Sequence, residues 1–273
     1  MNARWLLCSL AFVVVGCQLE PTKINETQKR ELVQVVEKAQ KPLESTEETV
    51  ILDARSAFDY GLDRVRNSIS FQWENLSENS RTGELLRDRN QAVTRLSLIG
   101  LTPTTPVIVL GYGPLGQGEE GRLAWTLLYY GFQDVQVSSI SAFRHSMTQE
   151  PTPPPKNVLR WTLNPHPEMM LSPEGLNRLD HAILIDVRSE KEYLAGTANA
   201  AANIKVLNIE WRKFYTAPGR PDLHFRKELA AVGVHPEDQI VVKSDRGVRA
   251  AAAAYALLAM GFPHVQVLMT PAL

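Results

Sequence analysis

A hydroxyl, a carboxylate and two guanidinium groups stand close together near the C-terminus, in the segment Ser244 to Arg249. The segment follows an apolar run, Ile240 to Val242, and leads into an alanine-rich stretch typical of a helix. A loop that enters a helix presents backbone N–H groups that stabilise an anion. We therefore expect a site for a small anion such as sulfate, thiosulfate or phosphate. Its candidate residues are Ser244, Asp245, Arg246, Gly247, Val248 and Arg249.

A second interpretation of the same segment needs no ligand. In it, Ser244 caps the following helix and Arg249 pairs with a carboxylate of the protein. Asp245 favours this interpretation, because its negative charge repels an anion. Catalysis by the Ser244 hydroxyl would require a positioned base, and the segment contains no histidine. We predict no catalytic residue here and leave the anion-site and helix-cap interpretations open.

The composition of the chain argues against several other classes of function. The net charge is −1, so no basic face is expected and nucleic acid is not an expected partner. The two cysteines, Cys8 and Cys17, both lie near the N-terminus, which leaves no disulfide framework for the body of the protein. The six histidines are scattered without the spacing of metal ligands, so we expect no metal and no cofactor.

The first seventeen residues have the pattern of a bacterial lipoprotein signal peptide. A short positive start is followed by the apolar run Trp5 to Val15 and then by Gly16-Cys17. That run is too short to cross a bilayer as a stable helix. We predict a signal peptide at residues 1–17 with acylation of Cys17, and a polar tether at 18–26. The alternative is an ordinary secretory signal.

The predicted anchor has consequences for location and partners. Gln18 stands where a signal for retention in the inner membrane would have Asp, which favours the periplasmic side of the outer membrane. The expected location is therefore the cell envelope, with membrane contact through the lipid. A second protein of the envelope is an expected partner.

The remainder of the chain repeats itself at a spacing of about 133 residues. An apolar run ends in Asp53-Ala54-Arg55 in the first half and in Asp186-Val187-Arg188 in the second. Apolar strands that alternate with helices predict an α/β class, in which each domain is a parallel sheet with helices on both faces. The proline-rich stretch between the copies predicts a connector. We expect domains at 27–150 and 164–273, joined by a linker at 151–163.

Individual elements follow from the same patterns. We expect helices at 31–40, 122–130, 173–179 and 248–260, the third with Ser172 as its N-cap. The Asp-x-Arg pairs are expected to form local ion pairs at the ends of their strands. Glu119 and Glu120 are expected in an acidic loop exposed to solvent. Four tryptophans are expected in the core or between the domains: Trp73, Trp125, Trp161 and Trp211.

These motifs together resemble the rhodanese family, over about residues 45–270. The segment from Asp186 to Tyr193 is similar to the first signature of that family, and Ile240 to Phe262 is similar to its active-site strand, loop and helix. The first copy resembles the non-catalytic N-terminal half of tandem thiosulfate sulfurtransferases. The resemblance implies tandem rhodanese-like domains and, as an activity, sulfur transfer.

The chain departs from this family at the position that carries the chemistry. The family's loop begins with a cysteine, whose thiolate stores sulfur as a persulfide; Gly247 and Arg249 match the loop, but Ser244 stands in the place of that cysteine. Serine is a much weaker acid than cysteine, and its oxygen cannot hold a persulfide. We therefore predict a binding or interaction module without enzymatic activity. The alternatives are a rhodanese-type sulfurtransferase and a structural envelope protein.

Overall fold

The computed structural model describes residues 43, 46, 48–154, 161–196 and 203–269. The expected signal peptide with Cys17, the tether, the expected helix at 31–40 and part of the linker lie outside the described residues. Two sheets are present, one in residues 48–154, here called the N-terminal half, and one in residues 161–269, called the C-terminal half.

The N-terminal half is built on a four-stranded parallel sheet with the order β3-β1-β6-β7. Its strands are β1 (Val50–Asp53), β3 (Ile69–Ser70), β6 (Val107–Gly111) and β7 (Val135–Ser139). Its α-helices are α2 (Ala57–Leu62), α3 (Arg89–Leu98) and α4 (Glu119–Tyr129), and its 3-10 helices are η1 (Trp73–Leu76), η2 (Gly113–Leu115) and η3 (Ile140–Ser146). Two small antiparallel pairs complete this half: β2 (Arg64–Val65) with β8 (Met147–Thr148), and β4 (Ser77–Asn79) with β5 (Glu84–Leu85).

The C-terminal half has a five-stranded parallel sheet with the order β11-β10-β12-β13-β9. Its strands are β9 (Met170–Leu171), β10 (Ala182–Asp186), β11 (Ile204–Asn208), β12 (Ile240–Lys243) and β13 (Val265–Leu268). Its α-helices are α5 (Pro173–Leu176), α6 (Glu190–Ala195), α7 (Phe225–Ala231) and α8 (Val248–Ala259), and its 3-10 helices are η4 (Pro167–Met169) and η5 (Trp211–Phe214). The first four strands repeat the order of the other sheet.

The strands form because short runs of β-branched and apolar residues are buried on both faces. In β10 and β6 every residue is buried, which is the pattern of a parallel strand covered by helices. The predicted α/β class is therefore confirmed. Four helix boundaries differ from the prediction. Helix α4 begins at Glu119, before the expected Arg122, and α5 ends at Leu176, before the expected Leu179. Helices α4 and α8 each end one residue earlier than expected, at Tyr129 and Ala259. The predicted N-cap is confirmed, since the Ser172 hydroxyl accepts the N–H of Gly175.

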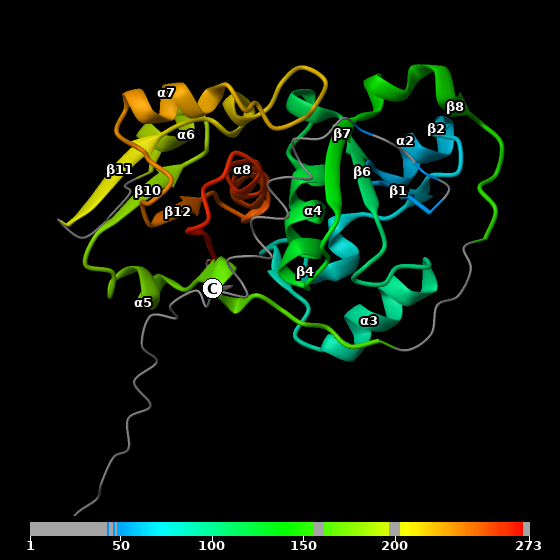
Figure 1. Ribbon diagram of the computed structural model, residues 1–273, viewed down its shortest axis with the longest axis horizontal. Helices are drawn as coiled ribbons and strands as arrows, with labels where there is room; N and C mark the ends of the chain where they lie inside the picture. Colours follow the sequence, from blue (N-terminus) through cyan, green and yellow to red (C-terminus); the bar gives the residue numbers. More distant parts are fainter. Residues whose placement is uncertain (1–42, 44–45, 47, 155–160, 197–202, 270–273) are drawn as a thin grey trace, which may run out of the picture.

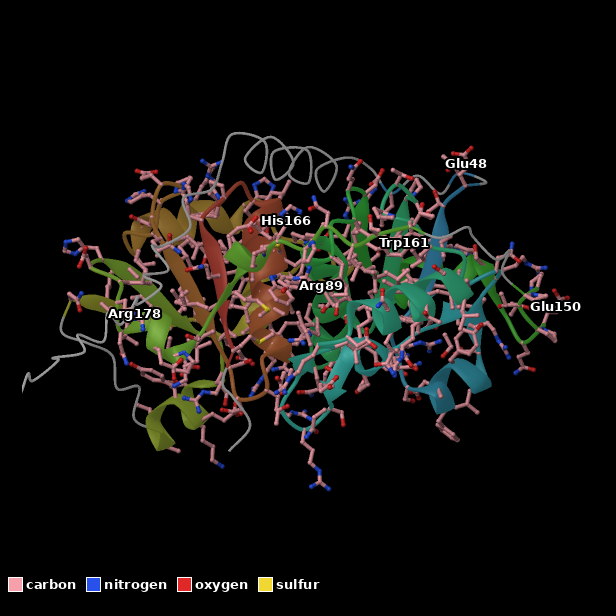
Figure 2. All side chains as sticks on the ribbon, turned by 90° about the horizontal axis from the view of Figure 1, so that it is seen from below. Glu48, Arg89, Glu150, Trp161, His166 and Arg178 are labelled. Atoms are coloured by element: carbon pink, nitrogen blue, oxygen red, sulfur yellow. The ribbon has the colours of Figure 1, made fainter. Side chains whose placement is uncertain are left out.

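Helices α4 and α8 lie side by side in the middle of the molecule, and each belongs to a different half (Figure 1). Small residues allow the close approach, since a Cβ atom added at Gly121 would lie 2.7 Å from the Cβ of Ala252. Every residue of α8 except Arg249 is buried. Figure 2 shows His166 and Arg89 near the boundary between the two halves, with Arg178 and Glu150 toward opposite ends.

The tryptophans pack as expected. Trp125 and Trp211 have no exposed surface, Trp73 is buried, and Trp161 packs edge-on against Phe132. No helix among the described residues has the length and apolar character needed to cross a bilayer.

Candidate functional site

The predicted anion-site segment forms a tight loop between β12 and α8, here called the Ser244 loop (Ser244–Gly247). Gly247 has φ of 71°, in the left-handed region where glycine has no steric penalty, and α8 begins at the next residue. The Ser244 side chain is buried, and its hydroxyl oxygen accepts the N–H of Ala250 at 3.0 Å. The hydroxyl therefore satisfies one free donor at the start of α8.

Arginines and carboxylates alternate in a chain of ion pairs beside this loop. Arg188 contacts Asp186 at 2.7 Å and Asp245 at 3.1 Å. Arg249 contacts both oxygens of Glu192 at 2.8 Å and Asp245 at 3.3 Å. The hydrogen bonds from Arg249, followed by one from Ser189, hold the pKa of Glu192 well below its usual range. Both contacts of the helix-cap interpretation are thus present, and the charge of Arg249 is largely neutralised.

An open pocket of about 290 Å³ lies over the loop. Gln117 contributes to its wall from the N-terminal half, so the pocket lies between the halves. Arg246 is the exposed arginine of this pocket. Its positive charge acts on the carboxylate of Glu74, a residue of η1, and no ion pair joins Arg246 to a described residue. The lining residues are Gln117, Glu192, Ser244, Asp245, Arg246, Val248 and Arg249.

The two Asp-x-Arg motifs form the predicted ion pairs at the ends of β1 and β10. Arg55 contacts Asp53 at 2.8 Å, and the Asp53 side chain has no exposed surface. The pair formed by Asp186 and Arg188 has the same pattern, with the aspartate again wholly buried. In each motif the backbone N–H of the arginine also donates to the aspartate Oδ1, at 3.1 Å. This arrangement supports a structural role for both motifs.

The predicted acidic loop exposed to solvent is wrong for Glu120. Glu119 and Glu120 both lie in the first turn of α4, and the Glu120 side chain is 1% exposed. Its carboxyl oxygens have no hydrogen-bond partner among the described residues, and they fill the space where a side chain at Gly111 would stand. Burial raises the pKa of Glu120 to about 8. The error arises because the segment forms the first turn of α4, which packs against α8 of the other half, and the Glu120 carboxyl group turns toward Gly111.

Sequence reasoning also missed Arg122, which is the other charged residue buried in α4. Its side chain has no exposed surface, and it donates to the carbonyl oxygens of Gly83 and Gly247, the second at 3.4 Å. The guanidinium lies 5.4 Å from the Trp73 ring and 5.6 Å from the Trp125 ring. Burial lowers the pKa of Arg122 to about 10, so the group remains positive at neutral pH. The signal available in the sequence was an arginine inside an apolar helical segment.

The described residues contain no group of three or more histidine, cysteine, aspartate or glutamate side chains arranged to hold a metal ion. The predicted lipidation residue, Cys17, lies outside the described residues and its modification stays a prediction.

Comparison with known proteins identifies the fold. Residues 173–270 match the model of the rhodanese-like domain. The chain is similar to SseA from Escherichia coli, described as a 3-mercaptopyruvate sulfotransferase of the rhodanese fold, with 18% identity, a TM-score of 0.68 and coverage of 81% of this chain and 92% of that chain. No curated protein sequence matches the chain.

A second solved structure extends this comparison. The anaerobic ergothioneine biosynthesis enzyme from Chlorobium limicola, in complex with trimethyl histidine, is 17% identical with a TM-score of 0.68. The match covers 84% of this chain and 63% of that enzyme. The C-terminal half thus matches a rhodanese-like domain, and the fold of the chain resembles the folds of these two proteins.

Proposed function

We propose that this protein is a tandem rhodanese-like module of the cell envelope that binds a ligand at the Ser244 loop and does not transfer sulfur. The observation that carries the proposal is the state of Ser244. Its hydroxyl is buried and accepts the backbone N–H of Ala250, so it caps α8, and no described histidine lies among the residues that line its pocket to act as a base. A persulfide requires a sulfur atom in the protein, and residues 18–273 contain no cysteine.

The pocket over the loop supports binding of a small anion. The N–H groups of Val248 and Arg249 belong to the first turn of α8, where a helix has no acceptors of its own. Arg246 adds positive charge at the mouth of the pocket. Arg249 is already paired with Glu192 and Asp245. Sulfate, thiosulfate and phosphate are the proposed ligands, and a carboxylate of an envelope protein partner has the same chemistry.

The first experiment measures transfer of sulfur from thiosulfate to cyanide by the full chain. We expect no thiocyanate above the buffer rate, and release of thiocyanate that depends on enzyme concentration would overturn the proposal. The control is Ser244→Cys, which restores the missing thiol. A low rate in that variant alone would show that the loop has kept the shape of an active site.

The second experiment tests the ligand by calorimetry with sulfate. We expect heat of binding in the unmodified chain, weakened in Arg246→Ala because the exposed charge is lost. Leu115→Ala is the control, since that side chain is 90% exposed and lies in the N-terminal half, outside the pocket lining. Equal heats in the chain and in Arg246→Ala would remove the anion from the proposal.

A rhodanese-type sulfurtransferase is the second candidate function. It is favoured by the similarity to SseA, which covers most of both chains. Without a loop cysteine, the persulfide would have to be supplied by a partner protein. Turnover that appears only when a thiol-containing protein from the same cell is added would support this candidate.

The proposed anchor is tested separately. Cells that express the chain are labelled with radioactive palmitate, and we expect label in the protein, lost in Cys17→Ser. Label that persists in this variant, or no label in the unmodified chain, would contradict lipidation at Cys17.

A further inference from the structure

Arg122 is the largest charged side chain that is fully buried, and no part of the proposed binding chemistry uses it. An isolated buried charge is costly unless polar groups compensate it. Here two backbone carbonyl oxygens and the faces of two tryptophans surround the guanidinium, and its Nε atom has no hydrogen-bond partner among the residues that the structure describes. The position of these partners indicates what the charge does.

The two carbonyl groups belong to different halves of the molecule. Gly83 lies in the turn between β4 and β5 of the N-terminal half, whereas Gly247 is the last residue of the Ser244 loop. Arg122 itself belongs to the N-terminal half. One side chain therefore joins its own half to the loop of the other half, across 125 positions of sequence.

The contact with Gly247 also bears on the direction of a backbone donor. The peptide between Gly247 and Val248 is planar and trans, so its C=O and N–H point in opposite directions. With the carbonyl directed at Arg122, the N–H of Val248 points away from the guanidinium, and Val248 lines the pocket. The same carbonyl oxygen accepts the N–H of Ala251 at 2.9 Å, so Arg122 and the first turn of α8 hold this donor in place together.

The turn at Gly83 contacts the preceding peptide of the loop. Gly83 has φ of 67°, and a Cβ atom there would lie 2.0 Å from the carbonyl oxygen of Arg246. Only a residue without a side chain permits this approach. Two consecutive carbonyl groups of the loop, those of Arg246 and Gly247, thus face the N-terminal half.

We propose that Arg122 is a positioning residue through which the N-terminal half shapes the Ser244 loop and places a fixed positive charge beneath it. The inference rests on the proposed function only in that this loop is the binding site. It gives the N-terminal half a defined role: it completes the site of the C-terminal half instead of carrying a site of its own.

The test compares amide hydrogen exchange in the full chain and in Arg122→Met. We expect the amides of Ala250 and Ala251, which donate to the Ser244 hydroxyl oxygen and to the Gly247 carbonyl oxygen, to exchange faster by roughly tenfold, about the loss of one hydrogen bond to a charged group. Arg212→Met is the matched control, because Arg212 donates to the carbonyl of Pro114 in the N-terminal half at 2.8 Å. It should leave exchange of these two amides unchanged. If Arg122→Met folds and both amides exchange at the original rate, the proposal is wrong.

Arg122→Lys decides the matter if the methionine variant does not fold. Lysine keeps the buried charge but cannot donate to both carbonyl groups with a planar fork. We expect faster exchange of the Ala250 and Ala251 amides in this variant than in the unmodified chain, and an unchanged rate would contradict positioning by Arg122.

The pKa of a thiol at position 244 would respond to the positive charge of Arg122. In the full chain with Cys8→Ser, Cys17→Ser and Ser244→Cys, the rate of alkylation by iodoacetamide against pH gives the pKa of a single thiol. We expect Arg122→Met to raise that pKa, and Arg122→Lys to raise it less; equal values in all three would refute the electrostatic role. Neither measurement needs a ligand, so failure of sulfate to bind would count against the proposed function alone.

Discussion

The two loops that precede α4 and α8 both end in a left-handed glycine, but an acid follows in one half and a base in the other. Each helix follows a left-handed glycine, Gly118 or Gly247, and the second helical residue is Glu120 in one half and Arg249 in the other. Arg249 is partly exposed and reaches two carboxylates, whereas Glu120 is buried and its carboxyl oxygens have no hydrogen-bond partner in the part of the chain that the structure describes. The difference shows that the N-terminal loop is closed by its own carboxyl group, while the Ser244 loop keeps an open pocket.

Each loop is also held by an arginine of the other half. Arg122 reaches Gly247 from the N-terminal half, and Arg212 of η5 reaches Pro114 from the C-terminal half. The two contacts differ in burial, because Arg122 is wholly buried and the Arg212 side chain is 40% exposed and pairs with Glu210. We therefore expect the Ser244 loop to depend more strongly on the opposite half.

The largest loss of stability is expected at the Asp-x-Arg motif, which both halves contain. Asp53→Asn and Asp186→Asn each remove the buried charge partner of an arginine and leave it only an exposed carboxylate, Asp63 or Asp245, so we expect a loss of up to about 3–5 kcal/mol. Urea unfolding of both variants at pH 7 measures the loss. A loss in one half alone would break the equivalence of the two Asp-x-Arg motifs.

Glu120→Gln tests the closed loop and should produce the next largest effect. Burial raises the pKa of Glu120 from 4.5 to about 8. The contribution of the neutral carboxyl group to the free energy of unfolding is therefore fully present below pH 4.5 and is lost as the pH rises toward 8. Relative to the unmodified chain, the free energy of unfolding of the variant should rise by up to about 1.4 kcal/mol per pH unit within that window. Unfolding measured at several pH values gives the slope, and parallel curves for the two proteins would contradict a buried neutral acid.

The smallest effect is expected at the open loop. Glu192→Gln removes an ion pair that is partly exposed, so we expect a loss of about 1 kcal/mol or less at pH 7. The pKa of Glu192 is lowered by Arg249, so this stability is present above its ordinary pKa of 4.5 and is lost as the pH falls below it. Unfolding at pH 7 and at low pH, with and without salt, checks this; a difference that persists in acid would point to a packing effect instead.

Local patterns were sufficient for much of the fold and part of the site. The apolar runs that became β1, β10 and β12, the Asp-x-Arg pairs, and the cap formed by Ser244 each depend on residues close in sequence. The burial of Glu120 and Arg122 depends on packing against the other half, so no local period or motif encodes it. The partner of Arg249 could be predicted as a carboxylate, but its identity as Glu192 required the placement of α6.

The close crossing of α4 and α8 has a consequence for how the protein comes apart. The main attachment between the halves is this contact of α4 with α8, where Gly121 meets Ala252. A protease that cuts the connector should therefore yield two fragments that still elute together as one particle and melt in a single cooperative transition.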